Sequence, residues 1–285
     1  MSGLVIPSVS RAQNASSKST HLHQPYVRKL RGGFTFTEGP VCDQRGDLYF
    51  SDVGEERIYC LSKDSLRVVR NSSNLANGLA FDQQGRMIVC ERGRLTRTEH
   101  DGRIAILAES FDGKGLHWPN DVVVRSDGSI FFTDLKQKKE WTNPAKTNFN
   151  AVYVLSNNNK LTLFSTECQA PNGIAFSPKE NLLYVADTDR RNLRMWQVNG
   201  DGIRTGRVFA ETSAAGAPDG IKTDRDGNVW VCEEEGVIVF SPSGDQILTI
   251  KVPEQPSNCA FAKDGSLLFV TARTSIYGVE FGRPL

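Results

Sequence analysis

The sequence has no long apolar run and no excess of positive charge, and these two absences exclude whole classes of protein. No stretch approaches the roughly 20 apolar residues that a membrane-spanning helix needs. Lys and Arg total 34 against 33 Asp and Glu, and no basic run is interleaved with aromatic residues. We therefore expect no membrane and no nucleic acid among the partners, and a small molecule as the substrate.

Several catalytic and metal-binding motifs are also missing. There is no Ser in a GxSxG turn, no Gly-rich phosphate loop and no CxxC or Cys/His cluster. The six Cys are scattered, and several lie inside strand-like patterns (Cys42, Cys90, Cys232 and Cys259). This usage predicts reduced, buried thiols. The N-terminus has only a short apolar fragment broken by Pro7, which makes a poor signal peptide, so we expect a cytoplasmic protein. We also expect a monomer or a weak homodimer.

No segment has a sustained helical period, and a short pattern is repeated six times instead. Each copy opens with a polar residue, usually followed by Gly, and continues as a strand, a turn rich in Gly and Asp, and a second strand. The copies begin 39 to 52 residues apart. They occupy residues 38–52, 77–91, 120–134, 172–187, 219–233 and 258–272.

A strand repeat of this length is typical of a β-propeller, in which each copy forms one small sheet. We therefore predict an all-β chain, a six-bladed β-propeller with about four antiparallel strands per blade. Residues 25–285 form one domain in this interpretation, and the polar, Ser-rich residues 1–24 form a flexible tail. A lone strand at residues 26–30 is predicted to close the last blade, which removes free sheet edges.

The second strand of each copy runs antiparallel to the first, so its end lies at the same face as the opening polar residue. That face should also carry the acidic residues that end five of the second strands. These are Asp52, Glu91, Asp134, Asp187 and Glu233. The connections at residues 112–119 and 135–150 leave this face, and we expect both to overhang the central opening.

Four of the six opening residues form a set of oxygen ligands, and two of the four carry negative charge. They are Glu38, Asn120, Asn172 and Asp219. Carboxylate and amide oxygens suit Ca²⁺, or Mg²⁺ and Mn²⁺ with more water. Only four protein ligands leave room for water and substrate, as a Lewis-acid metal requires. The alternative is that each Asn-Gly or Asp-Gly is ordinary turn chemistry.

Five stretches give the chain a family resemblance. They read FTEGPVCDQRGDLYFSD, NGLAFDQQGRMIVCERG, GKGLHWPNDVVVRSDGSIFFTD, APNGIAFSPKENLLYVAD and APDGIKTDRDGNVWV. The chain resembles the senescence marker protein/gluconolactonase/luciferin-regenerating family of six-bladed propellers, and the PND stretch looks most like the gluconolactonase branch.

The resemblance implies one divalent cation in the central funnel, most often Ca²⁺, with Mg²⁺, Mn²⁺ or Zn²⁺ as alternatives. The family's ligand positions match Glu38 of TEGP, Asn172 of PNGIAF and Asp219 of PDGIKTD, and Asn120 of PND matches a position that contacts metal or substrate. It also implies hydrolysis of sugar lactones and related esters, with Asp219 doubling as the base.

The remaining candidates lie around this set. His117 is expected to orient the substrate or act as an acid or base, against the alternative of an exposed loop His. We expect Arg92, Trp118, Asp121 and Asn77 near the substrate, although Asp121 could instead hold a turn and Asn77 could be structural. Arg92, the pair His117-Trp118 and Leu135 with the three residues after it depart from the branch's usual residues.

Three hypotheses follow for the function. The first is a metal-dependent lactonase in which Asp219 activates water while Asn120 and His117 orient the substrate. The second is a propeller enzyme with a bulkier biosynthetic substrate, acting by phosphotriester hydrolysis or by non-hydrolytic cyclisation or condensation. The third is a non-catalytic binding propeller that the metal stabilises.

Overall fold

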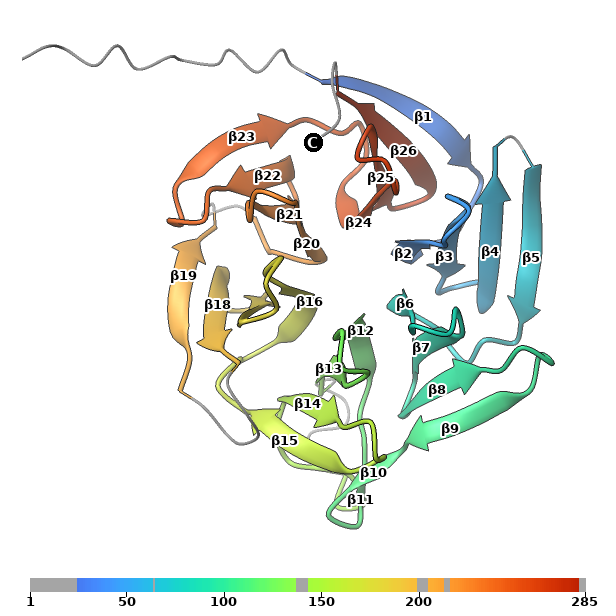
Figure 1. Ribbon diagram of the computed structural model, residues 1–285, viewed down its shortest axis with the longest axis vertical. Helices are drawn as coiled ribbons and strands as arrows, with labels where there is room; N and C mark the ends of the chain where they lie inside the picture. The colour runs from blue at the N-terminus through green and yellow to red at the C-terminus, as the bar shows by residue number, and fades with distance from the viewer. Residues whose placement is uncertain (1–24, 64, 137–142, 199–204, 213–215, 282–285) are drawn as a thin grey trace, which may run out of the picture.

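The computed structural model describes residues 25–63, 65–136, 143–198, 205–212 and 216–281. Six four-stranded antiparallel sheets are arranged around a common axis, so the predicted all-β, six-bladed propeller is confirmed (Figure 1). Among the described residues, no helix has the length and apolarity to cross a membrane. The predicted tail at residues 1–24 lies outside the described residues.

Each blade is a meander whose strands run outward from the axis in chain order, except in the last blade. The first blade contains β2 (Thr37–Cys42), β3 (Leu48–Asp52), β4 (Arg57–Ser62) and β5 (Ser65–Asn71). The second contains β6 (Leu79–Phe81), β7 (Met87–Glu91), β8 (Arg94–Thr98) and β9 (Ile104–Ala108). The third contains β12 (Pro119–Val124), β13 (Ile130–Asp134), β14 (Ala151–Leu155) and β15 (Leu161–Ser165).

The other three blades follow the same plan. The fourth contains β16 (Pro171–Phe176), β17 (Leu182–Asp187), β18 (Asn192–Gln197) and β19 (Arg207–Glu211). The fifth contains β20 (Ile221–Thr223), β21 (Val229–Glu233), β22 (Gly236–Phe240) and β23 (Gln246–Ile250). The sixth contains β24 (Pro256–Phe261), β25 (Leu267–Ala272), β26 (Ser275–Glu280) and, as its outer strand, β1 (Tyr26–Gly32).

Strand β1 closes the ring as predicted. It pairs antiparallel with β26 from Tyr26↔Glu280 to Gly32↔Ser275, so the beginning and the end of the described chain share one sheet. The Lys29 ammonium lies 2.9 Å from the carboxylate of Glu254, which adds an ion pair to this closure. Because β1 covers the edge of β26, that edge is not left free for pairing with another chain.

The hydrophobic core lies between the blades. Apolar clusters join each blade to the next, and one of them, in the second and third blades, contains Ile88, Leu95, Phe132 and Tyr153. Another joins the last blade to the first, because Ile276 packs with Phe50. All six Cys are free, five of them buried and Cys42 half-buried, as their positions in strands predicted. The blades therefore form one continuous ring that fixes the position of every inner strand.

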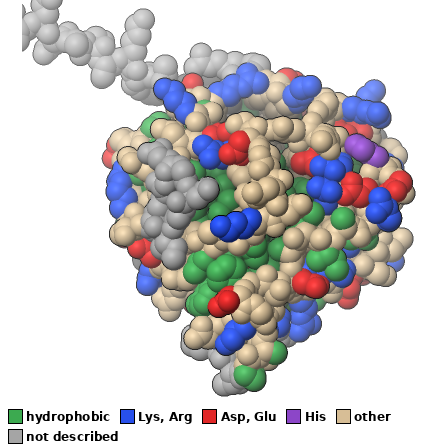
Figure 2. Space-filling view, turned by 60° about the horizontal axis from the view of Figure 1, so that its bottom comes forward, with side chains coloured by type: hydrophobic (Ala, Val, Ile, Leu, Met, Phe, Trp, Pro, Cys, Tyr) green, Lys and Arg blue, Asp and Glu red, His purple; other side chains and the backbone are tan. Residues whose placement is uncertain are grey.

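The expectation that residues 112–119 overhang the central opening is not confirmed for the whole segment. Part of it forms a small hairpin, β10 (Ser110–Phe111) with β11 (Lys114–Gly115), which projects at the periphery of the third blade (Figure 1). Part of the 135–150 connection lies outside the described residues. On the face in Figure 2, side chains of both charge signs are interspersed around apolar ones.

Candidate functional site

The six opening residues of the repeat lie around the propeller axis, at the start of the innermost strands. The pairing places them beside the ends of the second strands, since Thr37 pairs with Asp52 and Pro119 with Asp134. In four blades the register of this pairing shifts at the opening residue, for example between Glu38 and Val41. Such bulges re-aim a side chain out of the strand's alternation. We call Glu38, Asn77, Asn120, Asn172, Asp219 and Asn258 the polar ring.

The Gly that follows most of these residues is required by close packing at the axis. A Cβ atom on Gly78 would lie 2.6 Å from the carbonyl oxygen of Asn120, and one on Gly39 would lie 2.0 Å from that of Asn77. Gly78 also donates its backbone N–H to the Asn120 carbonyl at 2.7 Å. Each such Gly lets the inner strand of the next blade approach, so the Asn-Gly pattern is more than turn chemistry.

The acidic residues at the ends of the second strands hold the backbone that leads into the polar ring. Asp52 accepts hydrogen bonds from the N–H groups of Thr35 and Phe36, and Asp134 accepts them from the N–H of His117. Asp187 does the same for Gln169 and Ala170. All three carboxylates are fully buried. They share the predicted face, but their role is to fix the chain just before Glu38, Asn120 and Asn172, a role that sequence reasoning missed.

Glu38 and Asp219 are the charged members of the polar ring, and their environment opposes charge. Burial, and next the charge of Asp219, raise the pKa of Glu38 well above its usual range. Burial, and next the charge of Asp121, raise the pKa of Asp219 to about 7, although a hydrogen bond with Asn172 and the charge of Arg273 oppose the rise. Among the described residues, no Lys or Arg forms an ion pair with either carboxylate. Neither carboxylate therefore has an ion-pair partner among them, and only the charge of Arg273 partly offsets that of Asp219.

The Asn side chains of the ring differ in whether their amide groups have hydrogen-bond partners. Asn172 donates from Nδ2 to the Thr188 hydroxyl at 3.2 Å. The Oδ1 of Asn77 is buried and has no hydrogen-bond partner among the described residues. Asn120 is half-buried, and its carbonyl accepts from Gly78. The ring therefore offers amide oxygens beside two carboxylates, which is the ligand chemistry of Ca²⁺ and related hard cations.

This donor set fits a divalent cation. Two carboxylates without an ion-pair partner among the described residues, Glu38 buried and Asp219 half-buried, and one orphaned buried amide oxygen are costly unless a positive charge compensates them. No group of three His, Cys, Asp or Glu suited to a metal occurs in the part of the chain that the structure describes. A site here would therefore have to combine the two ring carboxylates with amide oxygens.

The position of His117 differs from the expectation of an exposed or substrate-facing residue. Its side chain is fully buried, and Nε2 lies 2.6 Å from the carbonyl oxygen of Thr147. Thr147 also donates its N–H to Gly115, so the end of the long connection runs beside the segment that precedes β12. This contact favours a role for His117 in joining the two segments rather than in acid–base chemistry.

The structure brings Arg92 and Trp118 together, two residues predicted to face the substrate. The Arg92 guanidinium carbon lies 5.9 Å from the centroid of the Trp118 ring, a cation–π arrangement. Arg92 is exposed and Trp118 is half-buried. The indole Nε1 of Trp118 is buried without a hydrogen-bond partner among the described residues. The pair combines a cation with an aromatic ring, and Trp118 precedes Asn120 by two residues.

Asp121 lies deeper at the axis than a substrate-binding role requires. It is 2% exposed, and its carboxylate accepts hydrogen bonds from the N–H of Val122 at 2.9 Å and of Ile174 at 3.3 Å. It also lies 3.7 Å from the Lys222 ammonium of the fifth blade. Lys222 was not among the predicted residues.

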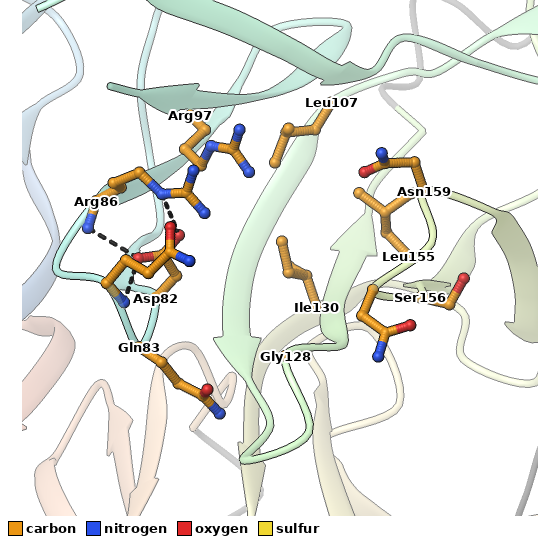
Figure 3. Close-up of a pocket in the computed structure, with 12 residues that line it drawn as sticks. Asp82, Gln83, Arg86, Arg97, Leu107, Gly128, Ile130, Leu155, Ser156 and Asn159 are labelled. Atoms are coloured by element: carbon orange, nitrogen blue, oxygen red, sulfur yellow. Dashed lines mark hydrogen bonds and ion pairs between the residues drawn. The ribbon is translucent and has the colours of Figure 1, made fainter. Parts of the chain in front are cut away.

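A cavity of about 230 Å³ lies on the opposite face, between the turns of the second and third blades (Figure 3). Its charged lining residues pair with one another or with Glu99, which lies outside the lining. Arg86 pairs with Asp82 at 2.8 Å and with Glu99 at 3.3 Å, and Arg97 pairs with Glu99 at 2.6 Å. None of the predicted site residues lines it. The candidate site is therefore the polar ring and not this cavity.

Comparisons with known proteins show the family of the chain. Residues 36–274 match the model of the SMP-30/Gluconolactonase/LRE-like region. A gluconolactonase of Zymomonas mobilis is 29% identical over 224 residues, which cover 72% of this chain and 63% of that protein. Lactonase drp35 of Staphylococcus aureus is 27% identical over 255 residues, covering 84% of this chain and 76% of that protein.

The fold comparison gives a similar picture. The solved structure of a gluconolactonase from Xanthomonas campestris superposes with a TM-score of 0.83 at 30% identity and covers 90% of both chains. The matched part of this chain spans just under two thirds of the Zymomonas enzyme.

Proposed function

Because the chain belongs to the SMP-30/gluconolactonase/LRE-like family, we propose that it is a lactonase that opens a cyclic ester at the polar ring. The observation that carries the proposal is the pair of ring carboxylates, the buried Glu38 and the half-buried Asp219, whose pKa values are raised and which form no ion pair among the described residues. The relatives named above are a gluconolactonase and a lactonase.

Glu38, Asn172 and Asp219 would hold the divalent cation, with Asn120 beside them, and Ca²⁺ is the ion that this oxygen set suits best. When bound, such an ion supplies Lewis-acid polarisation of a carbonyl oxygen. Asp219 is the residue that takes a proton from the attacking water, and its hydrogen bond with Asn172 keeps the carboxylate oriented. Asn120 offers an amide to orient the lactone ring.

The substrate side of the proposal rests on Arg92 and Trp118. The guanidinium of the exposed Arg92 lies within cation–π distance of the indole, and together they present a cationic, aromatic surface to a ring-shaped substrate. A sugar lactone and a bulkier aromatic lactone both meet this description, since each has a planar ester in a ring. We leave His117 out of the chemistry because Thr147 occupies its Nε2.

The test is hydrolysis of sugar, aliphatic and aromatic lactones by chelated protein to which Ca²⁺, Mg²⁺, Mn²⁺ or Zn²⁺ is returned. Asp219→Ala is assayed alongside, with Asp101→Ala as control because Asp101 is exposed and pairs only with Arg103 among the described residues. Turnover restored by metal, lost in Asp219→Ala and kept in the control supports the proposal. Tight metal binding without turnover of any lactone would reject it and favour a biosynthetic substrate or a binding role.

A further inference from the structure

Two charged residues break the repeat at positions where the other blades carry uncharged ones. The second position of the repeat is Gly in four blades and Cys259 in the sixth, but Asp121 in the third. The fourth position is Val, Ala or Phe in five blades, but Lys222 in the fifth. These departures have opposite charge, although 101 residues of sequence separate them.

The fold brings the two departures together at the propeller axis. The Lys222 ammonium lies 3.7 Å from Oδ2 of Asp121, and it donates to the Ile221 carbonyl at 3.0 Å and to Oδ1 of Asn258 at 3.3 Å. Asp121 is almost fully buried and the Lys222 side chain is 26% exposed. The space for the Asp121 carboxylate exists because Gly78 has no side chain, since a Cβ there would lie 2.7 Å from Oδ1 of Asp121.

Asn258, itself a member of the polar ring, connects this pair to Glu38. Its Nδ2 lies 3.4 Å from Oδ2 of Asp121, and its Oδ1 accepts from Lys222. A hydrogen bond between the Asn258 side chain and Glu38 counteracts part of the rise in the Glu38 pKa. Gly220 packs directly against this amide, with an added Cβ only 2.1 Å from the Asn258 side-chain carbon. The amide is thus fixed on several sides.

Lys222 also lies between the axis and a mainly apolar cavity of about 380 Å³ on the turn face of the propeller. Pro40, Val41 and Phe261 line this cavity together with Lys222. The aliphatic part of the lysine can lie along such a surface while its ammonium points to the axial polar groups. Lys222 therefore separates the buried polar groups of the axis from the opening on that face.

We propose that Asp121 and Lys222 form an axial ion pair that closes the propeller from the turn face and that, through Asn258, positions Glu38 of the polar ring. Lys222 is a positioning residue in this proposal, since it reaches Glu38 only through Asn258. The closing of the axis is independent of the proposed function, whereas the positioning of Glu38 as a cation ligand rests on it.

The experiment compares Lys222→Met, Asp121→Asn, the double variant and Lys263→Met as control. Lys263 lines the same cavity but is exposed and donates to the Gln44 carbonyl. Thermal unfolding is measured after chelation. Each single variant should lower the midpoint by about 5 °C or more, because it leaves a poorly solvated charge without its partner. The double variant should recover at least half of that loss, and the control should change by less than about 1 °C.

Calcium binding is then measured by titration calorimetry, with Ca²⁺ alone as the probe. Loss of a nearby positive charge would by itself tighten cation binding, whereas loss of a residue that orients a ligand weakens it, typically 10–100-fold. Lys222→Met should therefore weaken Ca²⁺ binding about tenfold, and the double variant should remain weak although its stability recovers.

If the double variant loses as much stability as the two single variants together, the proposed ion pair is contradicted. Unchanged or tighter Ca²⁺ binding in Lys222→Met would contradict the proposal that Lys222 positions Glu38. If the wild-type protein binds no Ca²⁺, the metal-dependent part of the proposed function is rejected. The unfolding midpoints of the single and double variants then still decide whether the axial ion pair exists.

Discussion

The polar ring and the ion-pair network of Asp82, Arg86, Arg97 and Glu99 beside the cavity of Figure 3 both contain carboxylates with limited exposure to solvent, but these charges are compensated differently. In the network, hydrogen bonding to Arg97 is the main cause that lowers the pKa of Glu99, and Arg86 pairs with both Glu99 and Asp82. In the ring, burial raises the pKa of Glu38 and no basic side chain of the described residues offsets it.

This difference separates a structural charge network from a site that needs a ligand. A carboxylate paired with Arg is compensated within the protein, so the cavity is complete as it stands. A buried carboxylate without a countercharge destabilises the fold, and a fold keeps such groups only where something else compensates for them. The polar ring is therefore the place where a cation and a substrate would act, although the cavity on the other face is well formed.

The largest effect should come from Asp219→Asn, which keeps the shape of the ring but removes one charge and the proposed base. Lactone turnover should fall roughly 10²–10⁴-fold, the usual contribution of a positioned acid–base group. Steady-state kinetics and circular dichroism would measure the loss and check the fold. Full turnover in the variant would mean that the ring carboxylate has no part in the chemistry.

Gly78→Ala compared with Gly85→Ala tests the close packing behind the ring. The new methyl group at Gly78 would meet the Asn120 carbonyl at 2.6 Å and backbone at Asp121, so we expect a loss of roughly 3 kcal/mol or more in the free energy of unfolding. Gly85, on the turn face, has φ of +75° and open space around it, so its loss should be about 1–2 kcal/mol. Denaturant titration measures both, and equal losses would contradict the packing argument.

The blades and most of the polar ring could be predicted from the sequence, because each copy of the repeat contains both the strands and the opening polar residue. Strand, turn and strand recur at intervals of 39 to 52 residues, and antiparallel pairing then places Glu38, Asn120, Asn172 and Asp219 at one face. The closing strand was predictable for a similar reason, since the last blade has only three strands until β1 pairs with β26.

Contacts between distant blades could not be predicted in this way. Asp121 and Lys222 lie in the third and fifth blades, and their pairing depends on how closely the inner strands approach at the axis. The burial of His117 could not be predicted because it depends on Thr147, which belongs to the long connection and not to the repeat. The acidic residues that end the second strands, such as Asp134, did leave a signal, a spacing of 16 to 18 residues from the amides that they hold.

Glu38→Gln and Glu99→Gln should change stability in opposite directions if the comparison of the two regions is right. After chelation, Glu38→Gln should raise the unfolding midpoint, because it removes a buried charge without a countercharge. It should also weaken Ca²⁺ binding about 100-fold or more, beyond the usual cost of losing an outer partner. Glu99→Gln should lower the midpoint and leave Ca²⁺ binding unchanged. If both variants changed the unfolding midpoint in the same direction, the distinction between uncompensated and compensated carboxylates would be wrong.

The smallest effect is expected from Glu254, a carboxylate near the closing strand that does have a cationic partner. Burial alone would raise its pKa, but hydrogen bonds from Ser275, Lys29 and Thr274 outweigh burial and lower the pKa to about 2. A pKa below the usual value of 4.5 means that the stabilisation is present above pH 4.5 and is lost as the pH falls toward 2.

Glu254→Gln should therefore cost roughly 1 kcal/mol at neutral pH, since the group is partly solvated. The difference between variant and wild type should shrink as the pH falls from 4.5 toward 2. Urea titrations across this range measure it, with Glu280→Gln as control because Glu280 pairs with Arg28 on the exposed surface. If the difference in the free energy of unfolding stays constant with pH, the closing strand is held by its backbone pairing and not by the charge of Glu254. The contrast between compensated and uncompensated carboxylates would then apply only to the polar ring and to the ion pairs beside the cavity.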